Sequence, residues 1–343
     1  MEKVLVTGGT GLLGGHLVEQ MVKLGYQVRA LARKTSDTRH LETTGVEIVY
    51  GDIEDYNSLV AAAKGRDVVF HAAARVSPGW GSWRNFENNI VKGTVNMLNA
   101  SIESGVKRFI YVSSATVVGK AAMGDKPADE NAPCEVELNP DSYYDYAKSL
   151  AEQQVLDYHK QGKISVIIIR LGMPYGPRCR LLSDRIYRYV KMFPVLPGKA
   201  DAKTALVYVT DVVDCILLAA NNEKADGQIY NIAPVEEVTF RDFINSMARA
   251  MGKSEFRFRV PLSVVYASAA VIERWGRLRR SKDAPFLTRS DIKFLRGGIY
   301  LDSSKARKEL GWQPKISIEE GCRQYVEWRR SQKKKHHRAG KEA

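Results

Sequence analysis

Short aliphatic runs alternate with amphipathic stretches over the first half of the chain. Runs rich in Val, Ile and Leu, bounded by glycine or polar residues, predict buried strands. The predicted strands are residues 3–7, 27–32, 47–50, 68–71, 109–113 and 164–170. Helical spacing of apolar residues between them predicts helices over residues 12–24, 56–64, 88–104 and 144–161. This alternation predicts an α/β fold of the Rossmann type, a doubly wound parallel sheet with helices on both faces.

The pattern changes after Leu171. Pro174, Pro177, Pro194 and Pro197 divide the next segment into short pieces, because proline interrupts both helices and central strands. Further on, the hydrophobic pattern predicts a return to the main domain at residues 207–220 and 228–232. Closing helices are expected within residues 240–281, over 302–310 and over 318–328.

Composition and charge are those of an ordinary globular protein. Of the 343 residues, 44% are hydrophobic and 27% charged, and the formal net charge is +13. Residues 329–343 hold seven lysines or arginines against one glutamate, in a polar and aperiodic C-terminal segment. We expect this segment to be disordered and solvated, and we expect no nucleic-acid partner.

The N-terminus and the cysteines bear on location. Met1, Glu2 and Lys3 lead directly into a strand instead of an apolar segment, so no secretory signal is expected. Four cysteines lie far apart with no Cys-x-x-Cys pair, which fits reduced thiols and argues against a metal site. These features predict a cytoplasmic protein.

Three glycines follow the first predicted strand and open the first predicted helix. Gly8 allows a tight turn, Gly11 a close approach of backbone to a pyrophosphate, and Gly14 the packing of helix on strand. The N-terminus of that helix offers free N–H groups and the positive end of its dipole to phosphates. The strand–turn–helix context therefore predicts a dinucleotide site. Its expected residues are Gly8, Thr10, Gly11, Leu12, Leu13 and Gly14.

Tyr144 and Lys148 are four residues apart in a predicted helix, so they share one face. A phenol has a pKa near 10 and is a poor acid or base at neutral pH. A cation one turn away favours the phenolate and lowers that pKa toward the working range. Tyr143 and Tyr146 lie nearby, but only Tyr144 has this spacing. The pair predicts acid–base catalysis.

Several further motifs occur in order along the chain. They are Gly51-Asp52-Ile53, His71 to Ala74, Gly93-Thr94, Val112 to Thr116, Tyr175 to Arg178, Tyr208 to Val212 and Lys305 to Trp312. Together with the glycine turn and the Tyr144-x-x-x-Lys148 pair, they make the chain resemble the extended short-chain dehydrogenase/reductases, the NAD-dependent epimerase/dehydratase family. Within that family the chain is most similar to the 3β-hydroxysteroid-dehydrogenase-like and dihydroflavonol-reductase-like subgroup.

The resemblance implies a division of the chain and a set of catalytic residues. It implies a dinucleotide-binding domain of residues 1–170 plus about 207–233, and a smaller, discontinuous substrate domain of about 171–206 and 234–328. It assigns catalysis to Ser114, with Ser113 as the alternative, and to Tyr144 and Lys148. It also implies a homodimer, because helices 88–104 and 144–161 resemble those that pair across a two-fold axis.

The residues that select between NAD and NADP are expected directly after the second predicted strand. NAD-specific relatives usually place an Asp there, whereas this chain has Arg33 and Lys34, which suit a 2′-phosphate. NADP(H) is therefore favoured, with NAD(H) the alternative. Asp52 and Ile53 resemble the pair that contacts adenine. The small side chains expected to let the cofactor lie against the strand end are Ala72, Ala73 and Ala74.

Two departures from the family pattern narrow the activity. Dehydratases of the family carry an Asp-Glu pair after the catalytic serine, and Ser114 is followed by Ala115 and Thr116 instead. A dehydratase is therefore disfavoured. The family usually has Asn three residues before its Gly-Thr, and this chain has Ile90 there, with Asn89 one position away. Whether Asn89 orders the active-site helix is left open.

The substrate is inferred from what surrounds the pocket. Nucleotide-sugar relatives commonly place Arg before the Tyr208 motif to hold a diphosphate, and this chain has Ala205 and Leu206 there. Trp80 and Trp83 are expected near the pocket mouth. The leading interpretation is an oxidoreductase for a hydrophobic hydroxy or keto compound, sterol-like or a β-keto acid. A nucleotide-sugar epimerase or reductase and a non-catalytic dinucleotide sensor are the alternatives.

An apolar run at residues 264–272 is too short to span a bilayer and is followed by a basic segment containing Trp275. Such a sequence suits the surface of an anionic membrane. A helix packed on the core with its charged end in solvent is the alternative. Weak peripheral association with the inner face of a membrane is thus a hypothesis from the sequence.

Overall fold

The computed structural model describes residues 2–76, 80–123, 126–279, 285, 287–289, 291, 292, 295 and 298–339. Its centre is a seven-stranded sheet in the order β10-β6-β5-β4-β1-β2-β3, and every pairing in it is parallel. The strands are β1 (Lys3–Thr7), β2 (Gln27–Ala32), β3 (Glu47–Tyr50), β4 (Val68–His71), β5 (Arg108–Val112), β6 (Ser165–Leu171) and β10 (Ile229–Ile232). The predicted Rossmann-type α/β fold is confirmed.

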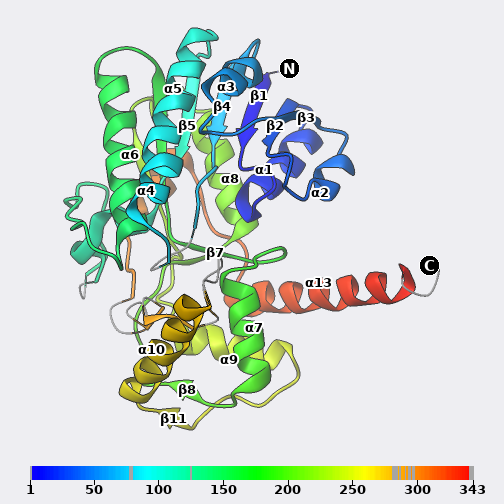
Figure 1. The fold of residues 1–343 in the computed structure, drawn as a ribbon, viewed down its shortest axis with the longest axis vertical. Helices are drawn as coiled ribbons and strands as arrows, with labels where there is room; N and C mark the ends of the chain where they lie inside the picture. Colours follow the sequence, from blue (N-terminus) through cyan, green and yellow to red (C-terminus); the bar gives the residue numbers. More distant parts are fainter. Residues whose placement is uncertain are drawn as a thin grey trace.

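Helices cover both faces of this sheet (Figure 1). Residues of α1 (Leu12–Lys23) and α8 (Val209–Ala220) share one core with Val4 and Val6 of β1. Leu5 points the other way, into a second core; it is shared by α3 (Tyr56–Ala63), α5 (Gly93–Glu103) and α6 (Tyr143–Lys160). Because side chains alternate along a strand, neighbouring residues of β1 pack against different sets of helices on the two faces of the sheet. Strand order reverses between β1 and β4, the position at which such sheets bind ligand.

A smaller region lies below the carboxyl ends of the strands in Figure 1. Its helices and strands are α7 (Leu182–Met192), β8 (Leu196–Pro197), α9 (Phe240–Ala250), β11 (Arg259–Val260) and α10 (Leu262–Leu278). It has a core of its own that includes Val190, Phe243 and Tyr325. The short strands β7 (Met173–Tyr175) and β9 (Leu206–Tyr208) pair in parallel where the chain passes between the two regions.

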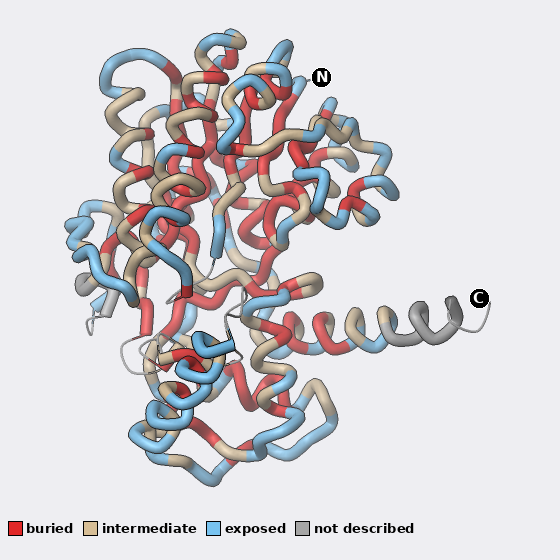
Figure 2. Tube along the Cα trace, in the orientation of Figure 1, coloured by how far each residue is buried: buried red, intermediate tan, exposed pale blue. Residues whose placement is uncertain are grey.

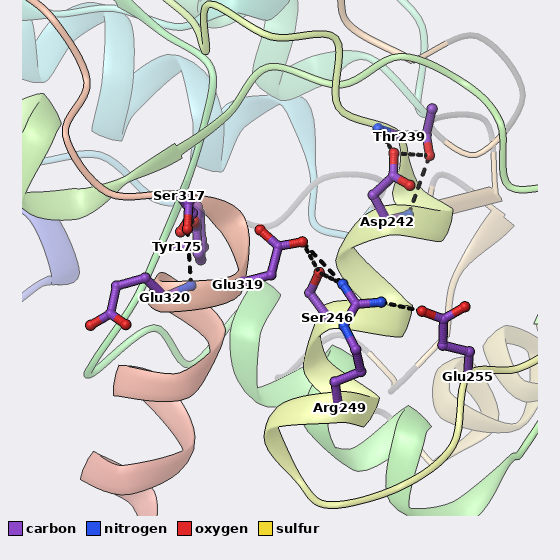
Figure 3. Close-up of polar contacts among 9 residues, drawn as sticks. All are labelled: Tyr175, Thr239, Asp242, Ser246, Arg249, Glu255, Ser317, Glu319 and Glu320. Atoms are coloured by element: carbon purple, nitrogen blue, oxygen red, sulfur yellow. Dashed lines mark hydrogen bonds and ion pairs between the residues drawn. The ribbon is translucent and has the colours of Figure 1, made fainter.

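Side-chain caps and ion pairs fix α9 and the last helix, α13 (Ile318–Ala339), to one another (Figure 3). Thr239 and Asp242 form a reciprocal capping box that begins α9. Near the other end of α9, Arg249 pairs with Glu255 and donates to Glu319 of α13 over 3.0 Å. Ser246 donates to the same carboxylate over 3.3 Å. These contacts set the angle at which α13 leaves the molecule.

Two sequence predictions are corrected by this arrangement. Residues 329–339 were expected to be disordered, but they continue α13 as a helix, because it begins in the packed core and runs outward. The remaining residues, 340–343, lie outside the described part. Residues 302–310 were expected in the substrate domain, yet α12 (Ser304–Leu310) packs on the sheet domain. Ala306, Leu310 and Trp312 belong to the core of α1 and α8.

Candidate active site

The glycine turn forms a cradle at the carboxyl end of β1. Gly8 has φ +76°, and a Cβ there would lie 2.8 Å from the backbone of Ala72 and Ala73. Gly11 donates to the carbonyl of Gly8 over 2.9 Å and is the N-cap of α1, with no side-chain cap. The first N–H groups of α1 are therefore available to an anion. Among the expected cofactor residues, this turn and first helical turn bring together Gly8, Thr10, Gly11, Leu12, Leu13 and Gly14.

Thr7 and His71 hold the facing strand end in place. The Thr7 hydroxyl lies 2.8 Å from His71 Nδ1 and accepts a hydrogen bond from the Ala73 N–H over 3.2 Å. Thr94 lies 3.3 Å from the other ring nitrogen of His71. Burial lowers the pKa of His71 to about 3, so the ring is neutral and can both donate and accept. The sequence analysis did not identify Thr7 as part of the site, although its position at the end of β1 is visible in the sequence.

The expected adenosine end of the site lies beyond β2 and β3. Arg33 and Lys34 follow β2 with exposed side chains, and no acidic residue stands at that strand end. Asp52 follows β3 and accepts a hydrogen bond from the Glu54 N–H over 3.0 Å. Ile53 is buried beneath Gly93 at the start of α5. These four residues thus lie along the same carboxyl edge as the glycine cradle.

Tyr144 and Ser114 meet at the end of β5. Tyr144 is in the first turn of α6, and Ser114 follows β5 by two residues. Burial, with a smaller contribution from the charge of Asp145, raises the pKa of the Tyr144 phenol, and a hydrogen bond with Ser114 opposes the rise. Tyr143 and Tyr146 instead pack on Trp83, with ring centroids 6.0 and 5.4 Å away. Only Tyr144 of the three therefore faces the serine.

Lys148 lies on the same face of α6, but its ammonium does not act on Tyr144 as the sequence analysis expected. Nζ donates to the carbonyl of Val112 over 2.6 Å and lies 4.3 Å from the ring centroid of Tyr111. Burial lowers the pKa of Lys148 to about 7, and Glu152 opposes this. The expected lowering of the phenol pKa is thus absent here, because the lysine points to the end of β5.

Ser113 is engaged elsewhere. Its hydroxyl donates to Glu152 over 2.5 Å, and the other oxygen of Glu152 accepts from Arg170 over 2.7 Å. All three side chains are buried. Ser113 is therefore part of a structural network, which leaves Ser114 as the serine that faces Tyr144. The sequence analysis did not predict Glu152 or Arg170, since nothing local marks two distant residues as an ion pair.

Asn89 has a role that the sequence left open. It lies in a π-helical turn, Glu87–Lys92, that precedes α5. A π-helical turn contains one more residue than an α-helical turn. Asn89 can therefore face the loop after β4 although it lies one position before the family's usual asparagine position. Its Oδ1 accepts a hydrogen bond from the Arg75 N–H over 2.8 Å. Asn89 thus fixes the chain directly after Ala72, Ala73 and Ala74.

The residues expected around the substrate are also placed. Trp83 lies against Tyr146 on α6, and Trp80 lies against Gly276 of α10, where an added Cβ would be 3.2 Å from its ring. Ala205 and Leu206, at the position where nucleotide-sugar relatives carry Arg, are buried. The two tryptophans therefore pack the segment that follows β4 against α6 and against α10.

Comparison with known proteins agrees with this geometry. The family model described as "NAD dependent epimerase/dehydratase family" matches residues 4–233. The chain belongs to this family. It is therefore an extended short-chain dehydrogenase/reductase, and the NAD(P)-dependent oxidoreductase class predicted from the sequence is confirmed.

Three relatives illustrate the range of the family. A 2-alkyl-3-oxoalkanoate reductase from Stenotrophomonas maltophilia is 30% identical, over 94% of this chain and 97% of the relative. The 3beta-hydroxysteroid-dehydrogenase/decarboxylase isoform 1 of Arabidopsis thaliana is 29% identical, over 94% and 78%. The solved structure of MoeE5 with UDP-glucuronic acid and NAD is 25% identical, with a TM-score of 0.74 over 96% of this chain and 99% of that one. Structural neighbours in the family thus bind NAD.

Two further findings concern metals and membranes. Within the described residues, no group of three or more His, Cys, Asp or Glu side chains is arranged to hold a metal ion. In the same part of the chain, no helix combines the length and apolar character that crossing a bilayer requires.

Proposed function

We propose that this protein transfers a hydride between a nicotinamide coenzyme and a hydroxyl or keto carbon of a hydrophobic small molecule, sterol-like or a β-keto or β-hydroxy acid. The observation that carries this proposal is that Ser114, Tyr144 and Lys148 lie at one carboxyl edge of the sheet, beside the glycine cradle. The cradle fits a pyrophosphate, because α1 begins after Gly11 with no side-chain cap and its first N–H groups are available to an anion. When bound, the coenzyme supplies or accepts the hydride.

The side chains of this site divide the proton chemistry between them. In the reducing direction, the proton on Tyr144 Oη passes to the substrate oxygen as that oxygen gains charge. The Ser114 hydroxyl donates a hydrogen bond to the same oxygen and stabilises the charge in the transition state. Because burial raises the pKa of Tyr144, the phenol carries its proton at neutral pH and is ready to donate it. In the oxidising direction the same groups act in reverse.

Lys148 is the third residue of the proposed catalytic group. Its Nζ is anchored to the carbonyl of Val112, at the strand end that precedes Ser113 and Ser114. With a pKa near 7, Lys148 can release a proton as the ammonium or take one up as the amine close to neutral pH. We therefore assign Lys148 the roles of anchoring the helix of Tyr144 to the strand end and of holding the coenzyme's ribose hydroxyls when the coenzyme is bound.

NADPH is the proposed coenzyme. A 2′-phosphate carries negative charge, and Arg33 and Lys34 present exposed cations directly after β2. An Asp at this strand end, which would accept hydrogen bonds from ribose hydroxyls, is absent from β2 and the two residues after it. Within the described residues, Asp37 is the nearest acid along the chain, and it is held by Arg39 over 2.6 Å.

Two observations support a hydrophobic substrate: the arginine that holds a diphosphate in nucleotide-sugar relatives is missing, and two tryptophans follow β4. Ala205 and Leu206 offer no cation to a diphosphate, and the segment that follows β4 contributes the aromatic side chains Trp80, packed on α10, and Trp83, packed on α6. The alkyl oxo-acid named for the Stenotrophomonas maltophilia relative fits such a surface. A nucleotide-sugar epimerase or reductase is the second candidate, supported by the nucleotide sugar bound to MoeE5.

The assembly and the location are also proposals. α5 and α6 pack side by side on one face of the sheet, and we propose that a second copy pairs with them to form a homodimer in the cytoplasm. Light scattering at micromolar concentration tests this assembly. A dimer mass is expected, and a monomer mass contradicts it. Peripheral association with a membrane is a separate proposal, and it depends on the surface of α10.

The experiment that tests the function is NADPH oxidation with a panel of a long-chain 2-alkyl-3-oxo acid, a 3-oxosterol and a UDP-sugar. Turnover of the oxo acid or the sterol, with coenzyme exchanging freely with solution, is expected. Interconversion of the UDP-sugar by protein that retains NAD through purification would favour the epimerase instead. Absence of turnover with all three substrates, in protein that binds NADPH, would contradict both enzymatic proposals for these classes.

A further inference from the structure

Helix α10 has an inner face that is packed against the protein and an apolar outer face that, among the described residues, is exposed. On its inner side Ala269 and Glu273 are buried, and Gly276 lies against Trp80. The carboxylate of Glu273 accepts from the backbone and side chain of Arg289, over 2.6 and 2.9 Å. This inner face therefore accounts for the attachment of the helix to the rest of the smaller region.

The outer face of α10 is apolar, although it faces solvent. Val264, Val271, Trp275 and Leu278 follow one another at intervals of seven, four and three residues, which places them on a single stripe. Their exposed fractions are 52%, 61%, 57% and 72%. Most of α10 is drawn as exposed in Figure 2, whereas the helices on the sheet are drawn largely as buried or intermediate. An exposed apolar stripe of this kind is typical of a surface that binds another molecule or a membrane.

The charge beside the stripe is of one sign. Residues 257–279 contain five arginines and one acidic residue, Glu273, which is buried and paired. At 3.6 residues per turn, Arg274 and Arg279 flank the stripe on its two sides. The guanidinium of Arg279 lies 4.7 Å from the ring centroid of Trp275. The partner of this face must therefore accept apolar side chains and carry negative charge around them.

A second copy of the chain does not meet that requirement. In a two-fold contact the same patch lies on both copies, so the arginines that flank the stripe, Arg274 and Arg279, would be brought close to those of the other copy. Like charges brought together in this way destabilise the contact. An anionic bilayer supplies what is missing: apolar depth for Val271, Trp275 and Leu278, and headgroup phosphates for the arginines. Tryptophan is also enriched at membrane–water interfaces.

The position of α10 connects this surface to the site. Its last turn contacts Trp80 through Gly276, and the guanidinium of Arg277 lies 5.8 Å from the Trp80 ring centroid. Trp80 belongs to the segment that follows β4, and the same segment begins with Ala72 and Ala73 at the glycine cradle. α10 is therefore in contact with the segment that follows the strand end beside the glycine cradle.

We propose that the outer face of α10 docks this enzyme on the surface of an anionic membrane, with Val264, Val271, Trp275 and Leu278 in the headgroup region. The docking itself follows from α10 alone. Its purpose, delivery of a substrate dissolved in the bilayer, rests on the proposed function. The two are separable, because vesicle binding requires no turnover, and turnover of a short-chain, water-soluble oxo acid requires no vesicle.

Flotation with phosphatidylcholine vesicles containing about 30 mol% phosphatidylglycerol tests the docking. The full-length protein is expected to float with these vesicles at low salt, and much less at about 0.5 M salt, because exposed charges are then screened within roughly 4 Å. It is expected to float poorly with pure phosphatidylcholine. Failure to float with the anionic vesicles at low salt would overturn the proposal.

Variants assign the binding to α10. Val271→Ser with Leu278→Ser, and separately Arg274→Glu with Arg279→Glu, should each reduce bound protein at least tenfold. The matched controls alter exposed residues of the sheet domain, Leu24→Ser for the apolar change and Lys23→Glu with Lys64→Glu for the charge. Controls that lose binding equally, or α10 variants that retain it, would overturn the assignment. Light scattering without lipid checks that the α10 variants keep the mass of the unmodified protein; a change in mass would show a protein contact instead.

A spectroscopic readout does not depend on yield or activity. Lipids brominated along the chain should quench a part of the tryptophan fluorescence, and that part should disappear in Trp275→Phe. The buried Trp312 provides the contrast, because Trp312→Phe should leave the quenched part unchanged. Quenching that persists in Trp275→Phe would place another tryptophan at the bilayer and contradict the proposed orientation.

Discussion

Glu152 and Arg170 form an ion pair in which the two side chains are only 2% and 3% exposed, with a shortest distance of 2.7 Å. The pair joins α6, which carries Tyr144 and Lys148, to β6 of the central sheet. The second carboxylate oxygen of Glu152 accepts from Ser113. The helix that presents Tyr144, the proposed catalytic tyrosine, is therefore tied to the sheet by buried charge.

Removal of one partner of this pair should destabilise the fold. Glu152→Leu leaves the Arg170 guanidinium buried without its carboxylate, and a cost of about 3–5 kcal/mol in the free energy of unfolding is expected. The double variant Glu152→Leu with Arg170→Met should recover most of that loss, because no charge is then left unpaired. Urea unfolding measures both. A single variant as stable as the parent would contradict the account.

Gly8 should tolerate no side chain. A Cβ there would lie 2.8 Å from the backbone of Ala72, at a φ of +76°. Gly8→Ala should reduce coenzyme affinity at least tenfold. Gly25→Ala is the matched control, since Gly25 has φ +85° with nothing within 4 Å, so it should cost only the backbone strain of about 1 kcal/mol and leave coenzyme binding intact. Calorimetric titration with NADPH measures the affinity; equal affinities in the two variants would be evidence against the cradle.

The buried His71 should make the free energy of unfolding depend on pH. Burial lowers its pKa to about 3 in the folded state, against about 6.5 in an unfolded chain, so the folded state binds fewer protons between these values. The stability from this group is complete above pH 6.5 and declines as the pH falls toward 3. Between pH 7 and pH 5 the loss should be about 2 kcal/mol.

The measurement is urea unfolding of the parent and of His71→Asn at pH 7 and pH 5. The variant should lose less stability than the parent over this interval, since its amide does not titrate. His159→Asn, on the outer part of α6, is the control and should behave as the parent does. Identical pH dependence in the parent and in His71→Asn would show that the buried ring does not set the slope.

Arg33 should select NADPH. Arg33→Asp removes a cation from the end of β2 and adds a carboxylate that repels a 2′-phosphate and suits free ribose hydroxyls. NADPH should bind more tightly than NADH to the parent, and the variant should reverse the order, by roughly 1.5–3 kcal/mol. Lys64→Asp, on an exposed residue after α3, is the charge control. Equal affinity of the parent for both coenzymes would contradict the assignment.

Much of the sheet domain could be predicted from the sequence, because its strands are continuous apolar runs. β1, β2, β3 and β4 begin and end at the predicted residues, and β5 and β6 are displaced by a single residue. Local signals also placed Gly8, Ser114 and Tyr144 at one edge. These features depend on nearest neighbours and on the rule that parallel strands share a carboxyl end.

Other features required the three-dimensional structure. Lys148 binds the carbonyl of Val112, 36 residues away, and no spacing rule indicates this. The sequence ranked Ser114 above Ser113 by resemblance alone, and the reason that Ser113 is engaged elsewhere, its hydrogen bond to Glu152, is a long-range contact. The polar composition of residues 329–339 suggested disorder, whereas the helix that contains them begins in the packed core of the smaller region. Long-range contacts decide such cases, and sequence periodicity does not record them.

The central claim is that Tyr144 transfers the proton. The most direct measurement compares turnover of NADPH with an oxo-acid substrate in the parent, in Tyr144→Phe and in Tyr146→Phe, with NADPH affinity determined for each. Tyr144→Phe should lower kcat by about 10²–10⁴-fold while NADPH affinity stays within a few-fold of the parent. Tyr146→Phe, on the same helix but packed against Trp83, should retain parental kcat. Near-parental kcat in Tyr144→Phe would contradict the account.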